Sequence, residues 1–120
     1  TGNLRATNAW RFYQLFNGRK RAGPTLMKEL ARTPPVPTTS IFSRTDGIVA
    51  WRCCLEKEGP TSENIEVQAS HVGMGLNPAT WYALADRLAQ PEGHWQPFQR
   101  EGLRALVFRN PARAGLFGLI

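Results

Sequence analysis

Two short runs of strand-forming residues, about twenty residues apart, constrain the fold of this chain more than any other feature. The first, TTSIFS at 38–43, is rich in β-branched and aromatic residues and follows the proline-rich stretch 34–37. The second, NIEVQ at 64–68, alternates Ile65 and Val67 with polar residues. A connection of this length indicates parallel pairing through a crossover. The strands therefore predict an α/β fold.

The stretch NPATWYALADRLAQ at 77–90 gives the clearest helix prediction. Asn77 is a favourable N-cap, and Pro78 suits the first helical position. Helical spacing places four apolar residues on one face: Trp81, Leu84, Ala85 and Leu88. Two further helices are predicted upstream, at 6–17 with an aromatic face and at 24–31. The chain therefore alternates helical and strand-like segments around a small sheet.

Length and composition indicate one modest globular domain. The chain has 120 residues, of which 42% are hydrophobic and 20% charged, and this balance is typical of a folded protein. No apolar run approaches the roughly 18 residues of a membrane span, and no signal pattern opens the sequence. We therefore expect a soluble chain, with a cytoplasmic location favoured. Because the sequence opens with Thr1 rather than Met, we also expect that it lacks upstream residues.

The net charge of +6 is concentrated in residues 5–32, where Glu29 is the one acid. Such a segment could bind nucleic acid through phosphate contacts. The basic run GRKR at 18–21 is short, however, and no nucleic-acid fold motif accompanies it. A specific nucleic-acid partner is therefore not expected. Cys53 and Cys54 are adjacent, which disfavours a bond between them and offers no metal-ligand spacing, so both are interpreted as structural thiols.

An acid and a histidine follow the two predicted strands. Asp46 lies in SRTDGIV at 43–49, and His71 lies in ASHVGMG at 69–75. Because functional residues gather beyond the carboxyl ends of parallel strands, we expect these two side chains to meet. A carboxylate that holds an imidazole is the supporting half of a hydrolytic triad. The alternatives are that Asp46 belongs to an Asp-Gly turn and that His71 is an ordinary loop histidine.

Small and polar neighbours are expected to support this pair. They are Gly47 beside the acid, Ser70 and Gly73 around the histidine, and Asn77 at the start of the following helix. With Gly75, the small residues around His71 would allow a sharp turn and leave the ring uncrowded. Arg44 is predicted to place a positive charge near the acid, and Trp51 to be a packing aromatic. His94 has no acid at a comparable spacing and is interpreted as structural.

Residues 35–98, which carry both motifs, resemble the C-terminal part of bacterial α/β-hydrolases of the serine esterase or lipase-like kind. The resemblance rests on PVPTTSIFSRTDGIVAWRCCLE and on ENIEVQASHVGMGLNPATWYALADRLAQPEGHWQPF. It implies that Asp46 and His71 are the acid and base of a Ser-His-Asp triad that hydrolyses a small ester or lipid-like substrate. That chemistry requires no metal or organic cofactor. Val72 departs from the family, which often has Cys there, and this leaves Cys53 and Cys54 free.

The resemblance also implies a domain plan. Residues 1–33 would form a helical cap, lid or connecting segment, and residues 34–98 a core segment with the acid and base loops. The implied fold is a partial α/β-hydrolase: the last parallel strands with flanking helices, as a three-layer αβα fragment. Residues 99–120 show no usable periodicity and are predicted to form an irregular tail.

The nucleophile of the triad is missing from this sequence. None of Ser40, Ser43, Ser62 and Ser70 lies within the G-x-S-x-G pattern of a nucleophile elbow, and no HGGG-like oxyanion turn is present. We therefore expect a C-terminal fragment that is inactive alone and that self-associates or pairs with its missing half. The alternative is a non-catalytic α/β module that completes a partner's sheet.

Overall fold

The computed structural model describes residues 15, 25, 28–29 and 32–110. Most of the helices predicted at 6–17 and 24–31, and most of the basic segment, therefore lie outside the described residues. Within the described part the fold is mixed α/β. None of the helices described there has the length and apolarity needed to cross a bilayer.

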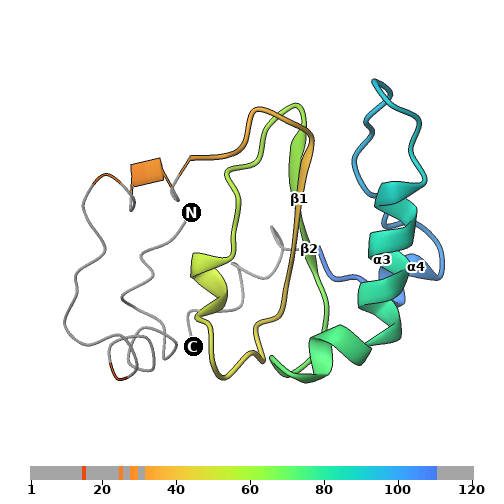
Figure 1. The fold of residues 1–120 in the computed structure, drawn as a ribbon. Coiled ribbons are helices and arrows are strands. Elements are labelled where there is room, and N and C mark those ends of the chain that lie inside the picture. Colours follow the sequence, from red (N-terminus) through yellow and green to blue (C-terminus); the bar gives the residue numbers. More distant parts are fainter. Residues whose placement is uncertain (1–14, 16–24, 26–27, 30–31, 111–120) are drawn as a thin grey trace.

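Two parallel strands form the sheet, as the sequence predicts (Figure 1). Strand β1 (Thr38–Phe42) pairs with β2 (Ser62–Glu66) in a register that runs from Thr38 opposite Ser62 to Phe42 opposite Glu66. The first strand lies within its predicted range. The second covers Ser62–Glu66 rather than 64–68, because Ser62 and Glu63 pair with β1 despite their polarity.

Helix α3 (Pro78–Leu88) confirms the strongest helix prediction. The Asn77 side chain accepts a hydrogen bond of 2.8 Å from the Ala79 N–H, as an N-cap should. Two short 3-10 turns, η2 (Trp51–Cys53) and η3 (Gly73–Leu76), lie in the loops that follow the strands. The C-terminal helix α4 (Arg104–Val107) falls in the segment expected to be irregular, so that expectation is wrong for these residues.

The hydrophobic core lies between β2 and α3 and is closed by residues that follow the helix. Ile65 of β2 and Val67, which follows the strand, pack with Ala83 of α3. Phe98 and Phe108 complete this cluster. The two phenylalanine rings meet edge to face, with centroids 4.8 Å apart. A large aromatic side chain buries much apolar surface and so stabilises the segment that carries it. Phe108 therefore explains why the chain turns back to the core after residue 99.

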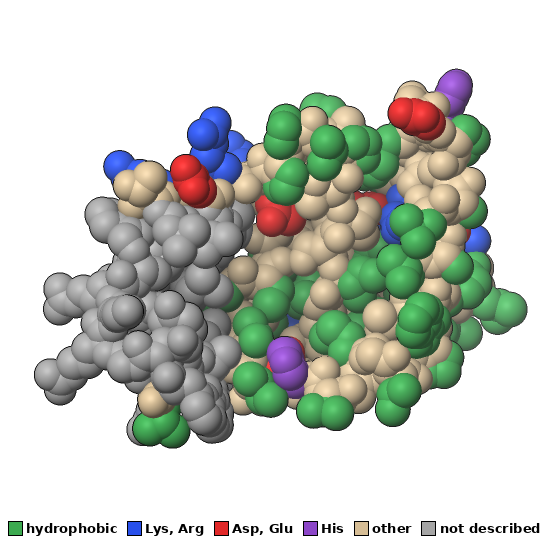
Figure 2. Space-filling view, viewed as in Figure 1, with side chains coloured by type: hydrophobic (Ala, Val, Ile, Leu, Met, Phe, Trp, Pro, Cys, Tyr) green, Lys and Arg blue, Asp and Glu red, His purple; other side chains and the backbone are tan. Residues whose placement is uncertain are grey.

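Helix α3 presents its apolar face away from this core. Trp81 is 58% exposed, Leu84 38% and Leu88 76%, and Figure 2 shows hydrophobic side chains at the surface of this part of the molecule. The residues that face β2 are spaced by four: Ala79, Ala83 and Arg87. Arg87 must face inward because it pairs with the buried carboxylate of Glu63 at 2.9 Å. This ion pair overrides the orientation that hydrophobicity alone would favour.

The opposite face of β2 is polar and buried beneath the connection between the strands. The Asn64 side chain accepts from the Glu56 N–H at 2.8 Å and donates to the Glu56 carbonyl at 2.9 Å. Glu66 accepts two hydrogen bonds of 3.1 Å from Nε of Arg44. Because these buried polar groups are paired, the connection is held to β2 at Arg44, near the acid loop, and at Glu56.

Candidate active site

The structure brings Asp46 and His71 together beyond the carboxyl ends of β1 and β2. Nδ1 of the imidazole lies 2.7 Å from Oδ2 of the carboxylate. The acid side chain is only 6% exposed, whereas that of the histidine is 44% exposed. The parallel pairing explains the contact, since both strands deliver their following loops to the same edge of the sheet. A buried acid thus orients an accessible imidazole.

The second carboxylate oxygen of Asp46 is held by its own loop. Oδ1 accepts hydrogen bonds from the backbone N–H groups of Ile48 at 2.8 Å and Val49 at 2.9 Å. This is the turn role that an Asp-Gly pair commonly plays. The turn and the histidine contact use different oxygens, so the two interpretations of this residue are compatible. The turn fixes the direction in which Oδ2 meets the imidazole.

The local environment favours the ionised form of Asp46. Burial is the largest single influence and raises the pKa of this carboxyl. The hydrogen bond to His71, the N–H groups of Val49 and Ile48, and the charge interaction with the imidazole together outweigh it, so the pKa is lowered below its usual value. The group is therefore a carboxylate at neutral pH.

This charge state determines the hydrogen-bond roles in the histidine. A carboxylate can only accept, so Nδ1 of His71 must carry the proton that bonds to Asp46. In the neutral ring, Nε2 then carries the free lone pair. Within the described part of the chain, no hydrogen bond occupies Nε2. The ring is therefore arranged as a base that could accept a proton from a group outside the described residues.

Two of the predicted supporting residues shape the turn that carries His71. The Ser70 hydroxyl accepts from the Gly73 N–H at 3.1 Å, and the Ser70 carbonyl accepts from the Met74 N–H at 2.9 Å. A Cβ on Gly73 would lie 2.8 Å from the Ser70 hydroxyl oxygen, closer than real contacts allow. Gly47 and Gly75 have no atom within 4 Å of such a position. Of these three glycines, Gly73 is the one where a larger residue would displace the Ser70 hydroxyl.

Asn77 links the two ends of the histidine loop. Besides capping α3, its side-chain amide donates to the Gln68 carbonyl at 2.8 Å. The residue that begins the histidine loop, Gln68, and the first turn of α3 are thereby joined through one side chain. The loop that carries His71 is consequently closed at its base, which agrees with the supporting role expected from the sequence.

Arg44, expected near the acid, has Glu66 as its ion-pair partner. Its guanidinium bonds to Glu66 and lies 4.0 Å from the ring centroid of Trp51. That ring in turn stacks on Phe42, with centroids 6.1 Å apart. Trp51 therefore packs as predicted, and Arg44 supports the connection rather than the Asp46 carboxylate.

The remaining candidates contribute no second reactive centre. Neither Cys53 nor Cys54 forms a disulfide within the described residues, and burial, followed by the charge of Asp46, raises the pKa of the Cys54 thiol. That thiol therefore stays protonated and weakly nucleophilic. Nδ1 of the exposed His94 lies 3.1 Å from the Glu92 carbonyl oxygen and not beside an acid. Over the described ranges, no cluster of three or more potential metal ligands is found.

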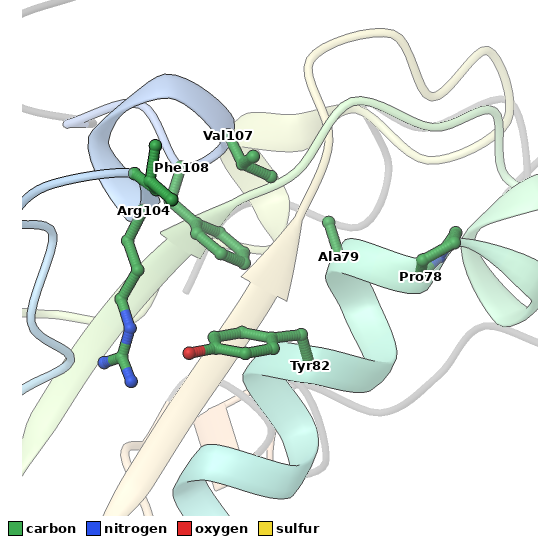
Figure 3. Close-up of a pocket in the computed structure, with 7 residues that line it drawn as sticks. Pro78, Ala79, Tyr82, Arg104, Val107 and Phe108 are labelled. Carbon is green, nitrogen blue, oxygen red and sulfur yellow. The ribbon is translucent and has the colours of Figure 1, made fainter.

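A separate apolar pocket of about 370 Å³ lies between α3 and α4 (Figure 3). The rings of Tyr82 and Phe108 form part of its wall, with centroids 5.9 Å apart. The guanidinium of Arg104, which also lines it, is paired with Asp86 at 3.3 Å. Neither Asp46 nor His71 lines this pocket. It therefore offers space without the reactive pair.

Sequence reasoning missed two hydroxyl residues beside the pair. Ser43, which is 2% exposed, and Thr45 both bond to the backbone of Ala69 in the histidine loop. The signal was present in the motif SRTD, where both hydroxyl residues lie within three positions of the acid.

Comparisons with protein-family models, curated proteins and solved structures gave no match to this chain. The site is therefore interpreted from its own geometry.

Proposed function

We propose that this chain supplies the acid and the general base of a serine hydrolase of the α/β-hydrolase type, acting on carboxylic esters. The observation that supports this most directly is the 2.7 Å contact between His71 Nδ1 and Asp46 Oδ2. It joins an ionised, oriented acid to an exposed imidazole, as two members of a triad require. The parallel strands that carry them suit the last part of such a fold, with a three-layer αβα arrangement in the complete enzyme.

In the proposed reaction the nucleophilic serine comes from another polypeptide segment. Nε2 of His71 would take the proton of that serine as the hydroxyl attacks the ester carbonyl. Asp46 would hold the ring and stabilise the imidazolium that forms. The ring would then protonate the departing alcohol, and a second proton transfer would activate water against the acyl-serine. Each proton passes through Nε2, and Asp46 stays ionised throughout.

The test is functional complementation. The chain alone should not hydrolyse a p-nitrophenyl ester, because none of its serines lies in an elbow motif. Co-expression with an upstream hydrolase segment that contains an in-frame G-x-S-x-G should restore hydrolysis that a serine reagent inhibits. Matched controls replace the elbow serine by alanine or carry His71→Ala. Serine-reagent-sensitive turnover by the chain alone, or restored activity that survives His71→Ala, would refute the proposal.

A second candidate function is a non-catalytic module that associates with a partner through α3. The exposed apolar residues Trp81, Leu84 and Leu88 favour it, since a helix normally buries such a face. Size-exclusion chromatography combined with the esterase assay separates the two functions. A monomer that stays monomeric in the presence of the upstream segment would argue against both assembly and association, whereas a complex without esterase activity would support the module alone.

A further inference from the structure

The acid and histidine loops are joined by a closed set of hydrogen bonds in addition to the Asp46 and His71 contact. Ser43 Oγ lies 2.9 Å from Thr45 Oγ1. The Thr45 hydroxyl donates to the Ala69 carbonyl at 3.0 Å, and the Ala69 N–H donates to Ser43 Oγ at 3.2 Å. These three contacts form a ring between residues just before the acid and a residue just before the histidine.

Counting protons fixes the direction of each bond in this ring. The Ala69 carbonyl can only accept, so the single proton of the Thr45 hydroxyl is committed to it. Thr45 Oγ1 must then accept from Ser43. Ser43 Oγ also accepts from the N–H groups of Thr45 and Ala69, each at 3.2 Å, which uses both of its lone pairs. The buried Ser43 hydroxyl is thus fully satisfied.

The ring extends the strand register beyond the sheet. Thr38 of β1 lies opposite Ser62, and Phe42 opposite Glu66, so partners are 24 residues apart. Thr45 and Ala69 are also 24 apart. The acid comes directly after Thr45, and the histidine comes two residues after Ala69, so these two residues are 25 apart. The two loops therefore leave the sheet in a fixed relation up to the reactive side chains.

We propose that Ser43 and Thr45 are positioning residues, whose hydroxyls hold the acid loop against the histidine loop and so align Asp46 with His71. Their hydroxyls bond to each other and to the backbone of Ala69. Only the effect on catalysis that we predict for these residues rests on the proposed function. The alignment itself is a property of this chain and can be measured without any substrate.

The first experiment compares Thr45→Val with Thr45→Ser by NMR on the complete 120-residue chain. Valine keeps the shape but removes the hydroxyl, whereas serine retains it. We expect the low-field resonance of the His71 Nδ1 proton to be lost in Thr45→Val and retained in Thr45→Ser. The amide signals of α3 should be unchanged in both. Retention of the low-field proton in a folded Thr45→Val variant would overturn the proposal.

A second measurement needs no variant and so remains decisive if Thr45→Val fails to fold. In the unaltered chain, the Ala69 amide should exchange with solvent as slowly as the amides of β2, because it donates to a buried hydroxyl. Exchange as rapid as that of an exposed loop amide would contradict the ring.

Activity separates failure of this inference from failure of the proposed function. In the complemented enzyme, Thr45→Val should lower kcat roughly tenfold or more with little change in KM, and Thr45→Ser should recover most of it. If complementation never yields esterase activity but both NMR results hold, the positioning role survives and the hydrolase proposal fails. If activity appears and Thr45→Val matches the unaltered enzyme, the positioning role alone is refuted.

Discussion

The strand-end loops and the outer surface of α3 differ in how many of their side chains have partners within this chain. In the loops, the carboxylate of Asp46 has partners for both oxygens, and the neighbouring hydroxyls and amides bond to one another. On the helix, Trp81, Leu84 and Leu88 remain exposed. The hydrogen bonds that hold the acid and the histidine are thus made within this chain, whereas the apolar side chains on α3 are left uncovered. The difference suggests that the reactive pair is assembled locally, whereas α3 requires a contact from elsewhere.

The largest expected effect tests whether the strand-end loops alone carry the chemistry. In the complemented enzyme, His71→Ala should lower kcat by about 10⁴-fold or more, because the serine would lose its base. Leu88→Gln, on the exposed side of α3, should leave kcat unchanged when the upstream segment is present at saturating concentration. Steady-state hydrolysis of a p-nitrophenyl ester measures both. A comparable loss in the Leu88 variant would remove the distinction between the two regions.

The next largest effect concerns the inward side of α3. Arg87→Ala should lower the free energy of unfolding by about 3 kcal/mol, since it leaves the nearly buried Glu63 carboxylate without its cation. Urea denaturation followed by circular dichroism measures the change. Lys57→Ala, at an exposed position, serves as the control and should stay within about 0.5 kcal/mol. Equal stability of the two variants would show that Arg87 does not fix the helix.

A smaller effect is expected from the pH dependence of the acid loop. The folded-state pKa of Asp46 is lowered, so its ionised form stabilises the fold above the unfolded pKa of about 3.9. That stabilisation should be lost as the pH falls through the folded-state pKa. The difference in unfolding free energy between the unaltered chain and Asp46→Asn should therefore be full near pH 6 and shrink below about pH 4. A difference that is constant from pH 6 to pH 3 would contradict the assigned charge state.

The smallest expected change in stability tests the outer surface of α3. Leu88→Gln should change the unfolding free energy by less than about 0.5 kcal/mol, because the side chain is 76% exposed. It should nevertheless weaken self-association, or binding to the upstream segment, in analytical ultracentrifugation. Lys57→Ala again gives the matched surface control. Unchanged association in Leu88→Gln would indicate that another surface makes the contact.

The sequence predicted the elements well where hydrophobic pattern and capping agreed. The first strand, the Asn77 cap and the parallel pairing follow from local residue types and from the length of the connection. The meeting of Asp46 with His71 follows from that pairing. The prediction placed β2 two residues too far along the chain, because Glu63 looks like a loop residue until its partner on α3 is known.

Other features depend on contacts that sequence spacing does not encode. The orientation of α3 is set by one ion pair rather than by its apolar stripe. Arg44 lies close to the acid in sequence, but Glu66 and Trp51 compete successfully for its guanidinium. Phe108 lies in a segment without periodicity, and it returns to the core through ring contacts with Phe98 and Tyr82.

The fixed parallel register has a consequence for folding and for length variation. Because strand partners are 24 residues apart, no short peptide from this chain can hold both the acid and the histidine in place. Closing such a loop costs about 3 kcal/mol of chain entropy, but a further ten residues in the connection would add only about 0.3 kcal/mol. In chain entropy alone, the exposed stretch 57–61 could therefore accept insertions, provided that the bonds from Ser62 Oγ to the Lys57 carbonyl and from the Thr38 N–H to the Thr61 carbonyl are kept. A single residue added between Phe42 and Asp46 would instead shift the acid relative to its partner.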